Sequence, residues 1–320
     1  MSAGVDLSVR VGSVDLPNPV MTASGTAGHG AELAAYGPLG ALGAVVVKSR
    51  AADPWPGNPA PRVREVGGGM LNSVGLQGPG IAAWLERDLP ALQATGARVV
   101  LSIWGRRVED YARAGALVAA AGALPGVVAV EVNVSCPNLE DRSRMFAHSP
   151  RATAEAVSAA ACGLPRWAKL SPNVTDLRPV AAAALDAGAE ALTLVNTLMG
   201  MAVDVDRRRP ALGGGGGGLS GPPLRPVAVR AVWECRRAFP DVGIVGSGGV
   251  GRGADAVELL LAGADAVQVG TATFRDPRAP WVVTRELVQW CRRHGVRKVS
   301  ELVGAAQQPA GGTLVAGGSA

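Results

Sequence analysis

Two asparagines and a cysteine follow an apolar segment near the middle of the chain. Residues 127–132 read Val-Val-Ala-Val-Glu-Val and lie between a Pro-Gly pair and a loop that begins at Asn133. β-Branched apolar runs bounded by turn residues are typical of buried strands. Cys136 lies in this loop between Asn133 and Asn138, beside a proline that restricts the backbone. We therefore expect these polar side chains at the end of a buried strand, where a site could form.

The chemistry of this group suits a planar ring. The amides of Asn133 and Asn138 each offer a donor and an acceptor, which can pair with the C=O and N–H edges of an amide-rich ring. A thiolate at Cys136 could take a proton from a carbon acid, if its pKa is lowered or a positive charge lies nearby. A cysteine alone in a turn is more often structural, and asparagine is common in turns. The two amides beside the thiol favour a catalytic site.

The lysines form a second group of candidates. Only three of the 31 basic residues are lysines, and two of them, Lys48 and Lys169, follow apolar runs where buried strands would end. A compact ammonium can approach the edge of a ring without needing a planar partner, which a guanidinium cannot. Lys298 fits the ordinary interpretation, a lysine at a strand edge with its charge in solvent. Lys48 and Lys169 are therefore predicted to contact a ligand.

Strand and helix patterns alternate along the chain and would position these residues. The predicted strands are 19–23, 44–48, 99–103, 127–132, 167–170, 191–195, 242–247 and 266–270. The predicted helices lie near 31–42, 81–95, 108–121, 151–162, 175–187, 224–239, 253–262 and 277–294. This alternation predicts an α/β fold, a (β/α)8 TIM barrel with its site at the C-terminal strand ends. We expect one domain over residues 1–320, with a flexible tail from about residue 306.

Segments outside this alternation complete the predicted architecture. Residues 7–10 and 14–16 predict an N-terminal β-hairpin that closes the bottom of the barrel. Long loops at the C-terminal face usually cover a substrate or contact a partner. They are 49–76, 134–150, which we expect to act as a mobile lid, and 196–223. The third contains six glycines, which predict a flexible segment, because no Lys-Ser/Thr follows them as in a phosphate loop.

Glycines after the last two strands predict a phosphate site. Gly248 and Gly249 follow the seventh strand, and Gly270-Thr271 follow the eighth. Loops at these positions of such barrels commonly bind phosphate, because backbone N–H groups without side chains can approach the anion. Gly221, after Leu219-Ser220, is a further candidate. The barrel is therefore expected to hold a ligand with a phosphate tail.

Composition excludes several classes of protein. A chain of 320 residues with 48% hydrophobic content can bury a large core. No apolar run approaches the roughly 20 residues of a membrane span, and the N-terminus lacks a signal pattern, so we expect a cytoplasmic protein without membrane contact. The charge of +5 is dispersed over many arginines, which disfavours nucleic-acid binding. No cysteine pair has the CxxC spacing, and we expect no metal site; the cysteines are at 136, 162, 235 and 291.

Seven stretches together resemble a known family. They are 21–25 (MTASG), 69–77 (GMLNSVGLQ), 133–138 (NVSCPN), 169–173 (KLSPN), 196–200 (NTLMG), 218–222 (GLSGP) and 269–272 (VGTA). In this order and over nearly the whole chain, the sequence resembles class 1 dihydroorotate dehydrogenases, most closely the catalytic subunit of the NAD-linked form. The Asn-x-Ser-Cys-Pro-Asn motif is specific, because the membrane-attached class 2 enzymes use serine as the base and carry an N-terminal extension.

The resemblance implies an FMN enzyme that oxidises dihydroorotate to orotate. Cys136 would remove the C5 proton, with Lys48 as a second catalytic residue, while hydride leaves C6 for flavin N5. Lys169 would lie at the N1/O2 edge of the flavin. The implied FMN contacts are Ala23, Ser24, Gly25, Lys48, Ser49, Ser102, Asn133, Lys169, Val195, Gly221, Gly248, Gly249, Gly270 and Thr271. The implied substrate contacts are Lys48, Asn72, Gly75, Leu76, Asn133, Asn138, Asn196 and Thr197.

Partners and alternatives also follow from the resemblance. It implies a homodimer and a separate FAD/[2Fe–2S] electron-transfer subunit, since the chain itself has neither a dinucleotide-binding fingerprint nor a cysteine cluster. Fumarate is the alternative electron acceptor. Ser102 and Gly78 stand where the family commonly has asparagine, Trp104 where a small residue is usual, and Arg144-Met145 make the lid bulkier and more basic. A dihydrouridine-synthase-like enzyme acting on tRNA and a repurposed FMN barrel of a secondary pathway are the competing hypotheses.

Overall fold

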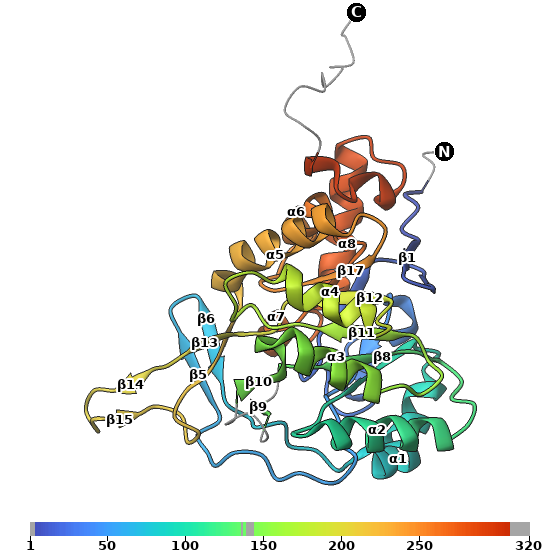
Figure 1. The fold of residues 1–320 in the computed structure, drawn as a ribbon. Helices are drawn as coiled ribbons and strands as arrows, with labels where there is room; N and C mark the ends of the chain where they lie inside the picture. The colour runs from blue at the N-terminus through green and yellow to red at the C-terminus, as the bar shows by residue number, and fades with distance from the viewer. Residues whose placement is uncertain (1–3, 136, 139–143, 308–320) are drawn as a thin grey trace, which may run out of the picture.

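Eight parallel strands form the core of the molecule. The computed structural model describes residues 4–135, 137–138 and 144–307. The strands are joined in the order β3-β18-β17-β12-β11-β8-β7-β4 (Figure 1). In chain order they are β3 (Val20–Thr22), β4 (Val45–Val46), β7 (Val99–Ile103), β8 (Val127–Asn133), β11 (Arg166–Lys169), β12 (Ala191–Leu194), β17 (Gly243–Ser247) and β18 (Ala266–Val269). The predicted barrel and its eight strands are confirmed.

The first and second strands of the barrel meet at a seam. Where the other strands pair over two or more residues, β3 and β4 share one isolated bridge, between Met21 and Ala44. Beyond this bridge a side chain replaces the backbone ladder. The hydroxyl of Thr22 accepts a hydrogen bond from Val46 N at 2.9 Å and donates to Val46 O at 3.3 Å. The barrel is therefore nearly closed, and a threonine side chain completes the closure.

Helices follow the strands as predicted, except that the helix near 31–42 is absent and the short α7 was not predicted. They are α1 (Ile81–Ala94), α2 (Val108–Ala120), α3 (Pro150–Ala159), α4 (Arg178–Asp186), α5 (Arg225–Ala238), α6 (Gly253–Ala262), α7 (Ala272–Arg275) and α8 (Ala279–Arg293). The helix predicted near 31–42 is wrong, because this segment forms two 3-10 turns, η1 (Glu32–Ala35) and η2 (Leu39–Ala41). Gly37 and Pro38 separate them. A Cβ at Gly37 would lie 2.7 Å from the Trp281 ring, and proline cannot donate a helical hydrogen bond. Within the described residues, no helix is long and apolar enough to span a bilayer.

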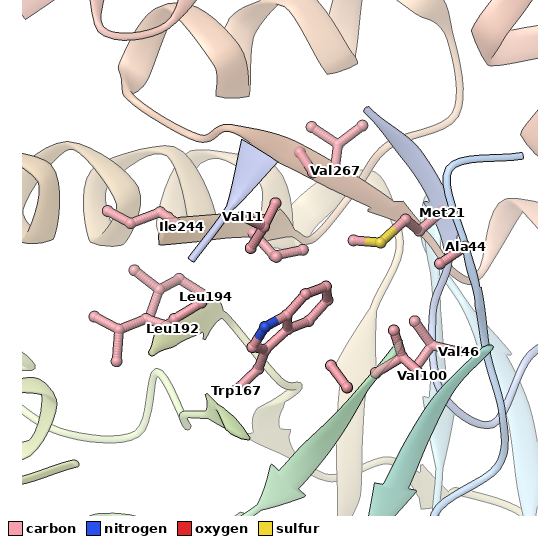
Figure 2. Close-up of a cluster of buried hydrophobic side chains, with 14 of the residues drawn as sticks. Val11, Met21, Ala44, Val46, Val100, Trp167, Leu192, Leu194, Ile244 and Val267 are labelled. Carbon is pink, nitrogen blue, oxygen red and sulfur yellow. The ribbon is translucent and has the colours of Figure 1, made fainter. Parts of the chain in front are cut away.

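The interior of the barrel is filled by apolar side chains from both the strands and the N-terminal hairpin. Figure 2 shows Trp167 of β11 among aliphatic side chains of the other strands. Val11, from the hairpin β1 (Val9–Val11) and β2 (Val14–Leu16), is fully buried in this cluster. Ser13 N donates to the carboxylate of Glu190, just before β12, at 3.1 Å. The hairpin therefore closes the N-terminal end of the barrel, as predicted, and leaves the opposite end for a site.

Two of the long loops combine into one sheet at the C-terminal face. Strands β5 (Val63–Val66) and β6 (Gly69–Asn72) come from the first loop, and β13 (Leu198–Gly200) and β16 (Gly217–Ser220) from the third. They pair in the antiparallel order β13-β16-β6-β5. The third loop also projects a hairpin away from the barrel, made of β14 (Val203–Asp204) and β15 (Arg209–Pro210) (Figure 1). The remaining short elements are β9 (Pro137–Asn138), β10 (Arg144–Met145), η4 (Phe146–His148), η5 (Pro222–Leu224), η6 (Val299–Leu302) and η7 (Ala305–Gln307).

Within the glycine run at 213–218, which was predicted as a flexible segment, Gly217 and Gly218 pack closely against other segments, whereas a Cβ at Gly215 would meet nothing within 4 Å. A Cβ at Gly217 would lie 2.6 Å from Asn72 O, and a Cβ at Gly218 would lie 2.5 Å from Thr197 Cβ. Glycine is needed here because two backbones approach closely. At the start of the predicted tail, the Gln307 side chain donates to Ala262 O at 2.6 Å. Residues 308–320 lie outside the described part of the chain.

Candidate active site

The residues predicted to bind a ligand lie at the C-terminal ends of the strands. In strand order, the predicted positions at the barrel are Ala23–Gly25 after β3, Lys48 and Ser49 after β4, Ser102 in β7, Asn133 ending β8, Lys169 ending β11, Val195–Thr197 after β12, Gly248 and Gly249 after β17, and Gly270 and Thr271 after β18. Cys136 lies outside the described residues, and Asn138 is described only as backbone in β9. The roles of both remain predictions.

A chain of hydrogen bonds joins polar groups from four strand ends. The hydroxyls of Ser102 and Ser49 lie 2.9 Å apart, and Asn133 Nδ2 donates to Ser49 Oγ at 3.3 Å. Asn196 Nδ2 donates to Asn133 Oδ1, also at 3.3 Å. Ser102 is fully buried, and its hydroxyl contacts the site only by bonding to Ser49. The longer side chain of an asparagine at this position would reach further into the site. The structure thus brings four predicted ligands into one connected group.

Lys169 enters the site with a buried carboxylate and a buried amide. Its ammonium donates to Gln268 Oε1 at 3.1 Å and to Ser24 Oγ at 3.3 Å, and lies 3.4 Å from Glu131 Oε1. Gln268 Nε2 in turn donates to Glu131 Oε2 at 2.8 Å. Sequence reasoning missed Glu131 and Gln268. The signal available was a glutamate inside an otherwise apolar strand.

Lys48 approaches the same region from the other side of the seam. A Cβ at Gly25 would lie 3.4 Å from Lys48 Nζ, and the φ of Gly25 is +84°, so the ammonium lies directly over a backbone that favours glycine. Ala23 N donates to Val269 O at 2.9 Å, which holds this loop against the end of β18. The two lysines therefore flank the segment 23–25.

The loops that would hold the substrate are fixed by side-chain amides. Asn72 Nδ2 donates to Gly218 O at 3.2 Å, and Asn196 Oδ1 accepts from Thr197 N at 2.9 Å. The sequence predicted no contact for Asn173, although it lies in the stretch 169–173, yet its side chain holds this loop at two points. Its Nδ2 donates to Thr197 O at 3.0 Å, and its Oδ1 accepts from Met199 N at 2.8 Å. Asn173 therefore positions the backbone on both sides of residue 198.

Gly75 and Leu76 form an unusual turn beside this sheet. Their φ angles are +70° and +60°, and a left-handed conformation is uncommon for leucine. Such strained positions cluster at functional sites, and turns of this kind can aim backbone N–H groups at an anion. The geometry suits the predicted recognition of a carboxylate.

The predicted phosphate loops meet beside the end of β16. Thr271 Oγ1 donates to Ser220 Oγ at 2.7 Å, and a Cβ at Gly221 would lie 3.6 Å from Thr271 Cγ2. Gly221, Gly248 and Gly249 have φ angles of +92°, +144° and +72°. A hydroxyl and glycine backbones without side chains form a donor set that suits a phosphate. The residues present therefore fit a ligand with a planar ring and a phosphate group.

A buried cation lies behind Lys48 and was not anticipated. Arg50 is fully buried, and its guanidinium donates to His29 O at 3.0 Å and contacts His29 Nδ1 at 2.5 Å. Burial lowers the pKa of Arg50 to about 10. A Cβ at Gly78 would lie 3.5 Å from this guanidinium, so the small residue at 78 leaves room for Arg50. Trp104 packs edge to face on Trp55 with ring centroids 6.0 Å apart.

Comparisons with known proteins agree with this geometry. A family profile described as "Dihydroorotate dehydrogenase" matches residues 6–290. Proteins called "Dihydroorotate dehydrogenase B (NAD(+)), catalytic subunit" are similar over most of the chain. That of Geobacter sp. (strain M21) is 46% identical over 94% of this chain and 98% of its own. That of Desulforudis audaxviator (strain MP104C) is 47% identical over 96% of this chain and 99% of its own.

A solved structure supports the fold. The crystal structure of DHODH from Eimeria tenella in complex with ferulenol superposes with a TM-score of 0.75. The match covers 95% of this chain and 89% of the other, at 23% sequence identity. At this identity the likeness concerns the arrangement of strands and helices alone.

Proposed function

Because the chain belongs to the dihydroorotate dehydrogenase family, and within it to the catalytic subunits of the NAD-linked form that serve pyrimidine biosynthesis, we propose that its site binds FMN and oxidises (S)-dihydroorotate to orotate. The family uses a flavin. The observation that carries the proposal is the convergence of Lys169, Asn133 and Asn196 with Ser49 and Ser102 at one end of the barrel. The family match favours this function over the tRNA-acting alternative.

The cofactor would lie across the strand ends. FMN supplies the hydride acceptor, and the ammonium of Lys169 would hold the ring edge on which negative charge develops. The segment 23–25 would line the ring, with Lys48 beside it and Val195 buried below. Gly221, Gly248, Gly249, Gly270 and Thr271 would hold the phosphate through backbone N–H groups and one hydroxyl. The hydroxyl contact between Thr271 and Ser220 supports this assignment.

The substrate would lie under the four-stranded sheet. Asn72, Asn133, Asn138, Asn196 and Thr197 would pair with the amide edges of the pyrimidine. The backbone N–H groups of Gly75 and Leu76 would bind the carboxylate, for which their left-handed turn is suited. Cys136 would remove the C5 proton as the general base, and Lys48 would contact both rings. Holding both reactants in place supplies much of the rate enhancement expected of such a site.

The segment 199–205, which leads into the projecting hairpin, supports a homodimer. Within 199–205 alternate side chains are apolar and exposed: Met199 is 56%, Met201 61%, Val203 54% and Val205 78% exposed. A two-stranded hairpin is marginally stable alone in water, and a row of exposed apolar side chains on it marks an interaction surface. A second copy of the chain would cover this row. The name "catalytic subunit" of the relatives supports a separate partner, which we expect to carry FAD and a [2Fe–2S] cluster.

The proposal is tested with the purified chain. It should carry the yellow absorbance of FMN, and anaerobic dihydroorotate should bleach it. Replacing the base by Cys136→Ser should slow bleaching strongly near pH 7 while orotate still binds, because a hydroxyl is a much weaker acid than a thiol. The isolated chain should reduce dyes but neither NAD⁺ nor fumarate at a comparable rate. Bleaching at an unchanged rate in the variant would refute Cys136 as the base, and a colourless protein that cannot be reconstituted would refute the cofactor.

A further inference from the structure

One ion pair in this protein is buried inside the barrel. Among the described residues, the charged side chains that are buried are Arg50, Glu131, Lys169 and Asp255. Arg50 and Asp255 have charged neighbours closer to the surface. The side chains of Glu131 and Lys169 are 0% and 4% exposed and face each other at 3.4 Å. The pair therefore lies in a water-poor environment.

Gln268 closes this pair into a ring of three side chains. It accepts from Lys169 through Oε1 and donates to Glu131 through Nε2. The three residues come from β8, β11 and β18, and β18 is not a neighbour of the other two in the sheet order. Gln268 thus reaches across the barrel to hold both charged groups. The amide can make both contacts at once only in this orientation, because one end donates and the other accepts.

Stability does not explain the arrangement. Removing two charges from water is costly, and replacing a buried ion pair by packed apolar residues is often neutral or stabilising. The Glu131 Oε1 atom is buried and receives no hydrogen bond within the described part of the chain. An incompletely satisfied charged group in a core needs a reason other than packing. The proposed flavin edge beside Lys169 supplies one.

We propose that Glu131 and Gln268 are positioning residues that keep Lys169 protonated in both oxidation states of the bound flavin. This inference rests on the proposed FMN site. The substrate would give a hydride, which carries two electrons and one proton, to the ring, and its second proton to Cys136. The ring would then gain one negative charge beside an ammonium that is already present, and would draw no further proton from solvent.

Few other charges face this ammonium. Lys48 is the second cation at this end of the barrel, across the segment 23–25. The residues that contact or pair with Lys169 on the remaining strands are uncharged: Ser24 after β3 and Gln268 on β18 bond to it, and Thr193 is its register partner on β12. Glu131 is thus the carboxylate that compensates Lys169. Without it, two ammonium groups would share the site.

The test is the pH dependence of the flavin midpoint potential. Between pH 7 and 9.5 the wild-type potential should fall along one straight line, with one proton taken up for each two electrons. In Glu131→Gln, the uncompensated lysine should lose its proton in the oxidised protein and regain it when the ring becomes negative. The slope of midpoint potential against pH should therefore double for the variant over part of this range, because two protons are then taken up for each two electrons. A variant with the wild-type slope throughout would overturn the proposal.

Matched variants separate this role from a structural one. Glu131→Asp keeps the charge and should keep the single-proton slope. Asp265→Asn removes another carboxylate that is only 19% exposed and paired with Arg236, at the start of β18, and should change stability without changing the slope. If Glu131→Gln does not fold, the wild-type protein still tests the inference. A plot of its midpoint potential against pH that steepens toward two protons for each two electrons would overturn it. Absence of flavin absorbance in the wild type would instead refute the cofactor and the inference together.

Discussion

Replacing Gly218 by alanine should weaken substrate binding, because the new methyl group would overlap the side chain of Thr197. A Cβ at Gly218 would lie 2.5 Å from Thr197 Cβ and closer still to its hydroxyl. The side chains of Asn173 and Asn196 hold the backbone O and N of Thr197, so a shift of this backbone would strain these hydrogen bonds. The variant therefore tests whether the glycine run shapes the substrate pocket.

The expected size follows from overpacking. Forcing a methyl group into a filled space typically costs about 1–3 kcal/mol. If the displacement falls on the substrate loop, orotate should bind roughly five- to 150-fold more weakly, at 1.4 kcal/mol for each tenfold change. The FMN content should be measured as well, because Gly218 lies in the same strand as Ser220, which contacts Thr271 of the proposed phosphate site. Orotate titration followed by the flavin spectrum would measure the effect.

Gly216→Ala is the matched control within the same run. Its Cβ would meet Gly200 O at 3.3 Å, a contact that a small shift can relieve, and it would not touch Thr197. Orotate should bind to this variant with nearly wild-type affinity. Equal affinities for Gly218→Ala and the wild type would refute the view that glycine at 218 makes room for Thr197. Equal losses in both variants would point to general loosening of the loop.

Two further predictions concern stability and assembly. Burial and the neighbouring Arg50 lower the pKa of His29 below 6.5, so the unfolded chain binds more protons and stability should fall as the pH drops below about 6.5. His29→Gln should lose less in melting temperature between pH 7.5 and 5 than the wild type, and identical losses in the two proteins would contradict this. The isolated chain should sediment as a dimer. The double variant Met201→Asp/Val203→Asp should sediment as a monomer that keeps its FMN. A variant that still forms a dimer would show that the exposed apolar row at 199–205 is not the dimer interface.

Local patterns were enough to predict the barrel. The strand at 99–103 has the predicted bounds because its five residues are all buried, and a short, largely apolar run with β-branched residues, lying between Gly96 and Gly105, is typical of such a strand. The helix near 31–42 failed because Gly37 and Pro38 interrupt it, and the tight contact with Trp281 at Gly37 depends on a helix more than 240 positions later. Such contacts cannot be inferred from a local pattern.

Long-range pairing also limited the prediction of the site. The strand ends that carry Lys48, Asn133 and Lys169 were visible in the sequence, because each follows an apolar run. The sheet over them could not be predicted, since β6 and β16 pair residues that are 146 to 150 positions apart in the sequence. Glycines in the third loop suggested flexibility because composition does not report close approach of two backbones. The partnership of Glu131 with Gln268 likewise required knowing which strands face each other across the barrel.

The seam between β3 and β4 has a consequence for how the cofactor leaves. The other neighbouring strands of the barrel pair over two or more residues, whereas here the amide of Val46 donates to the hydroxyl of one threonine. The proposed flavin contacts lie on both sides of this junction: Ala23–Gly25 follow β3, and Lys48 follows β4. A bound flavin would therefore hold β3 and β4 together at this junction, and a transient separation of the two strands would release it. The residence time of the cofactor would then be set by how often the barrel opens.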